Sequence, residues 1–227
     1  MGERKSLVYP NGRKISYEYD ELARLSRLTD GEREISYCYD EDGHLSKKIF
    51  PDDIISSYSY NSRGLLESLI HQQNRELLEK YEYEYDLMGN KTAIGKRRKA
   101  VSSLSGIPAE TERRMQEESG NYEYRYDSMN RLIEVRKDRK RISQYEYDAF
   151  GNRVGRQTET ENIRYHYNAA NQLIHEEGIF PEQSYQYDAR GNLTAILQGE
   201  ITANQYVYDE TNRLAAAFHK KRAGRPV

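Results

Sequence analysis

The chain has 227 residues, of which 32% are charged, yet its formal net charge is only −2. Mean hydropathy is −1.03 and no run of about 18 apolar residues occurs, so the sequence predicts no membrane span. The 21 tyrosines and the near-zero net charge argue against disorder, because aromatic rings supply area that can be buried. We therefore expect an ordered protein with a thin, tyrosine-rich apolar layer.

The first 16 residues resemble the end of a repeat whose full copies follow. Tyr9-Pro10-Asn11-Gly12 is a turn signal that precedes Ile15. The opening segment Met1-Gly2-Glu3-Arg4-Lys5 is not followed by an apolar stretch. No signal peptide is therefore predicted, and the residues alone leave the localisation open.

From Tyr17 onward the pattern Tyr-x-Tyr-[Asp/Asn]-x-x-[Gly/Asn]-x-Leu occurs nine times. Successive copies start 20 or 21 residues apart, except for steps of 25 and 41, and the longer step indicates a copy lost near residue 104. The defining tyrosine pairs are Tyr17 and Tyr19, Tyr37 and Tyr39, Tyr58 and Tyr60, Tyr83 and Tyr85, Tyr124 and Tyr126, Tyr145 and Tyr147, Tyr165 and Tyr167, Tyr185 and Tyr187, and Tyr206 and Tyr208.

Each copy is predicted to form a strand, a tight turn and a returning strand. The two tyrosines share one face because side chains alternate along a strand, and the residues between them are mostly polar. The Asp or Asn that closes the strand can bond its side chain to backbone two residues on. We expect the residue three places later to be left-handed and to form a bulge. It is a glycine at Gly43, Gly64, Gly89, Gly151 and Gly191.

Three positions depart from this pattern. Ala23 stands where the first copy needs a left-handed residue, which would cost about 1–2 kcal/mol. Lys91 and Arg153 stand where the return strand of the other copies begins with leucine. The segment from Arg75 to Lys80 is expected to extend a hairpin loop.

Residues 96–120 interrupt the repeat. Pro108 near the start, Gly120 after the end and helix formers between them predict a short exposed helix or disorder near 97–120. The last residues, 219–227, form a basic tail. The predicted organisation is one repeat array over residues 1–218, with an insertion at about 96–120, followed by that tail.

The predicted fold class is all-β, with roughly 18–20 antiparallel strands arranged as consecutive hairpins. Neighbouring strands twist by about 20–25° and open sheets seldom exceed about 10 strands without curling. We therefore expect the hairpins to coil into a spiral or a partial β-shell.

No cluster of residues predicts catalysis, and no catalytic, metal or cofactor-binding residues are assigned. The carboxylates that recur once per period, such as Asp127 and Asp188, are interpreted as turn residues. The histidines lack metal-ligand spacing, and Cys38 is expected to be a surface thiol. Basic clusters at Lys96–Lys99 and Arg136–Arg141 are balanced by acidic residues, so nucleic-acid binding is not expected.

The motif, with Tyr9-Pro10-Asn11-Gly12-Arg13 leading into Tyr17-Glu18-Tyr19-Asp20, resembles the YD repeat of the Rhs (rearrangement hot spot) family over about residues 7–218. Wall-associated proteins, insecticidal toxin complexes and teneurins share it. The resemblance implies a hollow β-shell that encloses a toxic C-terminal domain of a bacterial polymorphic toxin, in a secreted or delivered particle. The closing segment and toxin domain of that family are not recognisable here, so we expect one component of a larger shell.

The leading hypothesis is a non-enzymatic wall segment that encloses or presents a toxin or partner polypeptide. Its expected partners are the rest of an Rhs shell or a toxin domain, and open strand edges predict self-association. The alternative hypothesis is a carbohydrate-binding or receptor-binding repeat module, in which exposed tyrosine rings stack on a glycan.

Overall fold

The computed structural model describes residues 3–99 and 119–219, and all regular structure in these ranges is β. The chain divides into two compact units. The first runs to Tyr124 and includes Lys137–Arg139, and the second comprises Arg125–Arg136 and the residues from Lys140 onward. The predicted all-β class is confirmed. Within the described ranges there is no helix that could cross a membrane.

Nineteen strands occur in the described residues. Up to the insertion they are β1 (Ser6–Val8), β2 (Lys14–Tyr19), β3 (Leu25–Thr29), β4 (Glu34–Tyr39), β5 (Leu45–Ile49), β6 (Ile54–Tyr60), β7 (Leu66–Gln73), β8 (Glu76–Tyr85) and β9 (Lys91–Arg98). After it come β10 (Gly120–Tyr126), β11 (Leu132–Lys137), β12 (Lys140–Tyr147), β13 (Arg153–Thr158), β14 (Asn162–Tyr167), β15 (Leu173–Glu177), β16 (Gln183–Tyr187), β17 (Leu193–Gln198), β18 (Ile201–Tyr208) and β19 (Leu214–His219).

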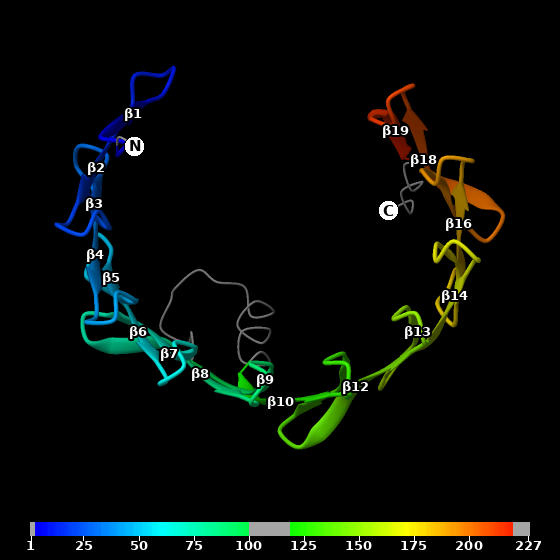
Figure 1. Ribbon diagram of the computed structural model, residues 1–227, viewed down its shortest axis with the longest axis horizontal. Coiled ribbons are helices and arrows are strands. Elements are labelled where there is room, and N and C mark those ends of the chain that lie inside the picture. Colours follow the sequence, from blue (N-terminus) through cyan, green and yellow to red (C-terminus); the bar gives the residue numbers. More distant parts are fainter. Residues whose placement is uncertain (1–2, 100–118, 220–227) are drawn as a thin grey trace, which may run out of the picture. The chain divides into compact units, whose positions relative to one another are not determined.

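In the first unit, strands that are neighbours in sequence from β1 to β10 are neighbours in the sheet, and each of these pairings is antiparallel (Figure 1). This meander runs from β1 to β10, and the same order runs from β12 to β19 in the second unit. Nine of the strands begin at the predicted leucine position, including the two that begin with Lys91 and Arg153. The predicted array of antiparallel hairpins is therefore confirmed.

The two faces of each tyrosine strand differ as predicted. Both tyrosines of every pair are half-buried, whereas the residue between them is exposed in all nine copies. Burial is shallow: among the described apolar residues only Val135, Ile163 and Ala195 are buried. The fold therefore rests on a thin layer of half-buried tyrosine rings and return-strand side chains rather than on a deep core.

The segment Arg75–Lys80 does not form the expected loop. Asn74 and Arg75 are both left-handed, with φ values of 50° and 69°, and make a tight turn between β7 and β8. Glu76 begins β8, so the extra residues lengthen two paired strands instead. Two consecutive left-handed residues match the right-handed twist of a hairpin, which explains why the strands continue to the turn.

The strands on either side of the predicted insertion reach into it. β9 continues to Arg98 and β10 begins at Gly120, so the repeat extends into both ends of the range 96–120. The predicted helix or disorder at 100–118 lies outside the described residues, as do residues 220–227 of the predicted tail. His219, placed in that tail, is the last residue of β19.

Candidate functional site

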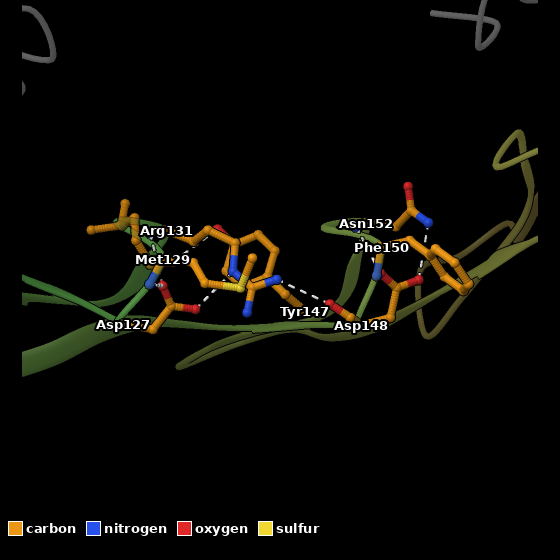
Figure 2. A network of polar contacts seen from close by, with 8 residues as sticks. Asp127, Met129, Arg131, Tyr147, Asp148, Phe150 and Asn152 are labelled. Carbon is orange, nitrogen blue, oxygen red and sulfur yellow. Dashed lines mark hydrogen bonds and ion pairs between the residues drawn. The ribbon is translucent and has the colours of Figure 1, made fainter.

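The feature repeated most faithfully is the turn after each tyrosine pair. In the turn after β10, Oδ1 of Asp127 accepts the N–H groups of Met129 and Arg131, each at 2.9 Å, and Oδ2 accepts Nε of Arg131 at 2.7 Å (Figure 2). The N–H of Asn130 donates to the Asp127 carbonyl at 3.0 Å. We call this set of bonds the turn network. It satisfies backbone groups that the bulge removes from the ladder.

The turn network recurs along the chain. The side-chain oxygen of the closing residue accepts N–H groups two and four positions on at Asp20, Asn61, Asp86, Asp148, Asn168, Asp188 and Asp209. Asp40 accepts from the residue four positions on, His44, at 2.8 Å. One short polar side chain therefore shapes each turn, as Asx turns do.

These bonds favour the ionised form of the carboxylates. The backbone N–H of Arg131 is the largest cause that holds the pKa of Asp127 below its ordinary value, and its side chain adds to this against the effect of desolvation. The Arg24 backbone has the same effect on the pKa of Asp20. At Asp86 and Asp188 a neighbouring asparagine side chain is the largest cause of the lowered pKa. A lowered pKa suits an anionic acceptor and does not suit a general acid that works near neutral pH.

The residue three positions after the closing residue is left-handed in every copy. Its φ lies between 58° and 90° at Ala23, Gly43, Gly64, Gly89, Asn130, Gly151, Asn171, Gly191 and Asn212. The ladder shifts register at the second tyrosine in the hairpins for which the pairing is described. The predicted turn with a left-handed bulge is confirmed, and Ala23 adopts the strained conformation at φ 61°.

The second tyrosine of a pair also bonds to the preceding copy. The hydroxyl of Tyr147 donates to the carbonyl of Leu132, the first residue of the previous return strand, at 2.8 Å. Equivalent bonds of 2.8–3.0 Å join Tyr39 to Leu25, Tyr60 to Leu45, Tyr85 to Leu66, Tyr167 to Arg153 and Tyr187 to Leu173. In these six copies the second tyrosine therefore ties the copy to its predecessor.

A basic side chain of the turn stacks on the same tyrosine. The Arg131 guanidinium lies 4.8 Å from the centroid of the Tyr147 ring and donates to the carbonyl of Asp148 at 3.0 Å (Figure 2). Arg24 lies 4.4 Å from the Tyr39 ring, and the His44 ring stacks on Tyr60 at 4.7 Å. The second tyrosine thus makes two contacts: its ring stacks with a side chain of the preceding turn, and its hydroxyl donates to a backbone carbonyl.

Arg153 shows why one return strand begins without leucine. Its guanidinium lies 5.5 Å from the Tyr145 ring and 5.6 Å from the Tyr165 ring. Lys91, at the equivalent place in β9, lies 5.0 Å from the Tyr83 ring. Tyrosine faces that carry such cations are less available to stack on a sugar, so this packing favours the structural interpretation of the tyrosines over the glycan hypothesis.

The tyrosine hydrogen bond was not predicted, and neither was the role of the residue four positions after the closing residue. That position holds Arg24, His44, Asn90, Arg131, Asn152, Gln172, Asn192 and Arg213, but Leu65 in the third copy. A side chain that can hydrogen-bond or stack there is a periodic signal that the sequence contains. The target of the tyrosine hydroxyl required the register of the sheet.

Four residues of the basic clusters are paired with acids. Arg98 contacts Glu79 at 2.5 Å and Arg136 contacts Glu134 at 2.7 Å. Lys99 pairs with Glu76, and Lys140 pairs with Glu159. Intramolecular neutralisation leaves less positive charge for a polyanion, which favours the prediction that these clusters do not bind nucleic acid.

The remaining reactive side chains are scattered. Cys38 is exposed on the polar face, as expected of a surface thiol. In the part of the chain that the structure describes, no group of three or more His, Cys, Asp or Glu residues has the arrangement of a metal site. The predicted repeat-defining tyrosines and glycines are brought together as nine similar hairpins and not as one centre.

Comparisons with known proteins agree with this geometry. The family model described as Teneurin YD-shell matches residues 104–222. No protein with a curated description matches the chain. A mutant Tc holotoxin pore of Photorhabdus luminescens matches in structure with a TM-score of 0.62 and 18% identity, over 96% of this chain and 13% of the matched chain.

Two further structures match at 18% identity and show the same fold. The TcdB2–TccC3 complex gives a TM-score of 0.60 over 93% of this chain and 13% of the matched chain. The TcdB2–TccC3–Cdc42 complex gives 0.59 over 94% and 13%. The chain thus spans about an eighth of the length of these proteins. Its sequence match and its array of β-hairpins place it in the Teneurin YD-shell family, among the YD-repeat proteins to which Rhs shells belong.

Proposed function

We propose that the chain is a non-enzymatic wall segment of an Rhs-type YD-repeat shell, and that the shell encloses or presents a toxin or another partner polypeptide. The observation that carries this proposal is the repetition of one kind of turn in all nine copies, with the second tyrosine bonded to the copy before it in six of them. A residue set that recurs once per period builds an extended surface, whereas catalysis concentrates different residues at one place.

The comparisons support the same proposal. The structural neighbours are a Tc holotoxin pore and complexes of TcdB2 with TccC3, and the matched region is a small part of each. By analogy, the partners of this chain are the rest of a larger shell and the polypeptide inside it, and its destination is a secreted or delivered toxin particle. The finer assignment rests on fold-level analogy.

Exposed strand surface supports self-association or pairing with a neighbouring shell segment. In β19, Leu214 is 55% exposed and Phe218 is 58% exposed. Strands that expose apolar side chains and unpaired edge groups pair readily with other chains. Light scattering over a range of concentrations tests this, because the proposal expects the mean mass to rise with concentration, and a constant monomer mass contradicts it.

A pair of deletions tests whether the copies are interchangeable wall units. Removing residues 165–184 excises one period and joins Arg164 to Tyr185, so the tyrosine strand keeps its register. We expect a folded, shorter array with unchanged β-sheet circular dichroism per residue. Removing residues 165–174 excises half a period, which deletes one strand and reverses chain direction, and we expect it to unfold the following copies. The scaffold proposal fails if both deletions leave the array folded or both unfold it. It also fails if the first deletion abolishes an enzymatic activity of the chain.

A further inference from the structure

The lengthened β7–β8 hairpin forms one wall of a hollow in the first unit. The hollow has a volume of about 570 Å³, within the range of about 300–1,000 Å³ typical of ligand sites. Phe50 and Pro51, from the connection before β6, and Leu78 of β8 are apolar residues of its lining. The site exists because this copy breaks the period of 20–21 residues, and such departures from a local rule are where function is expected.

A serine and a histidine in the lining of this hollow are hydrogen-bonded to each other. Ser56 of β6 is 1% exposed, and its hydroxyl lies 2.7 Å from Nδ1 of His71 on β7, its direct cross-strand partner. That bond fixes the orientation of the imidazole, as partners of histidine usually do. Nε2 of His71 has no hydrogen-bond partner among the described residues, and His71 lines the hollow.

The charges around the hollow balance. Arg33 and Asp52 line it with opposite formal charges, and the carboxylate of Glu79 is paired with Arg98 at 2.5 Å and with the Tyr81 hydroxyl at 2.9 Å. An ion would therefore gain little net attraction here. Balanced charges, apolar residues in the lining and the available Nε2 of His71 suit a neutral, largely apolar group that carries one polar atom.

We propose that this hollow binds the side chain of a tyrosine in an extended polypeptide. The ring lies against Pro51 and Leu78, and the phenol hydroxyl bonds to Nε2 of His71. The hydroxyl both donates and accepts, so it serves either tautomer of the imidazole. The proposal rests on the proposed function only for the source of that polypeptide, which is the chain held by the shell.

The test uses the full chain labelled with ¹⁵N and three capped peptides, acetyl-Gly-Tyr-Gly-amide and its Phe and Ser analogues. Imidazole nitrogen resonances are followed during each titration. We expect the Tyr peptide to shift the Nε2 signal of His71 in a saturable way. The Phe peptide should bind about 2–12-fold more weakly because it lacks the hydroxyl, and the Ser peptide should cause no shift.

The second unit supplies a matched control. His175 makes the same kind of bond to a serine, with 3.1 Å between its Nδ1 and Oγ of Ser184, so its resonances should stay fixed. The variant Leu78→Ala should weaken the Tyr peptide about tenfold without disturbing Ser56. The variant His71→Gln keeps a partner for Ser56 and should abolish the preference for Tyr over Phe, which is followed in this variant by the backbone amide resonance of Leu78.

Equal shifts at His71 and His175, no saturation at His71, or an affinity unchanged by Leu78→Ala would each overturn the proposal. The deletion of residues 165–184 lies in the other unit and tests the wall function separately. Loss of peptide binding with interchangeable copies would therefore refute the hollow as a site and leave the proposed function standing.

Discussion

The bond between Tyr147 and the preceding copy gives the sharpest prediction about stability. Tyr147→Phe removes the hydroxyl that donates to the Leu132 carbonyl at 2.8 Å, but it keeps the ring beside Arg131. A partly buried hydrogen bond contributes about 0.5–1.5 kcal/mol net, so we expect the free energy of unfolding to fall by about 1 kcal/mol. Tyr147→Ala also removes the half-buried ring and its cation–π contact, and should cost about 2–3 kcal/mol.

Urea denaturation followed by circular dichroism measures both variants. The control is Tyr145→Phe, because the hydroxyl of Tyr145, two residues earlier in β12, has no hydrogen-bond partner in the described part of the chain. That variant should lie within about 0.5 kcal/mol of the parent, as substitutions outside a bonded network do. The reasoning is refuted if Tyr147→Phe is as stable as the parent, or if the control loses as much.

Three further predictions concern the turns and the rings. Ala23→Gly relieves a left-handed alanine at φ 61° and should raise the free energy of unfolding by about 0.5–1 kcal/mol, since the strain of about 1–2 kcal/mol is offset in part by the entropy of glycine; a loss of stability in the same urea assay would contradict it. Turn carboxylates such as Asp127 have a folded pKa below 3.8, so their contribution is fully present above that unfolded value and is lost as pH falls through the folded pKa. The urea concentration at the unfolding midpoint should therefore decrease as the pH is lowered below about 4. A midpoint concentration that stays constant from pH 5 to pH 2 would be inconsistent with this. Burial raises the pKa of the tyrosines Tyr83 and Tyr187 above 10.0, and at Tyr185 a hydrogen bond to Glu176 adds to burial. Their contribution to stability is present below pH 10.0 and is lost as the pH rises through the folded pKa, so the urea concentration at the midpoint should fall over this range. Tyrosinate absorbance of the folded chain should appear at higher pH than that of the unfolded chain. Titration of the folded and unfolded chains at the same pH would speak against this.

Much of the fold was predictable because the same strand and turn pattern occurs in nine copies. The Tyr-x-Tyr alternation predicted the strands, and the Asp followed by Gly or Asn predicted the left-handed bulge that Gly151 and Asn130 adopt. The β7–β8 hairpin was mistaken for a loop because Glu76-Leu77-Leu78-Glu79-Lys80 lacks two-residue alternation. Its strands are set by the turn at Asn74 and by pairing with a neighbour, which the local pattern does not contain.

The bonds between copies could not be predicted for a related reason. The acceptor of the Tyr147 hydroxyl is a backbone carbonyl 15 residues earlier. Every residue has a backbone carbonyl, so residue type does not identify the acceptor. The pair Ser56 and His71 is likewise 15 residues apart and meets only through the register of β6 and β7. Composition and spacing identify what repeats, whereas cross-strand register decides which side chains meet.

Native-state amide hydrogen exchange of the turn N–H groups tests the central claim most directly. If every copy is held by the same turn network, the N–H groups that donate to the closing residues, such as those of Met129 and Arg131, should be protected in all the copies. Protection of similar size is expected from the turn at Asp20 to the turn at Asp209. Protection confined to one or two copies, with the others exchanging as fast as an unfolded chain, would contradict it.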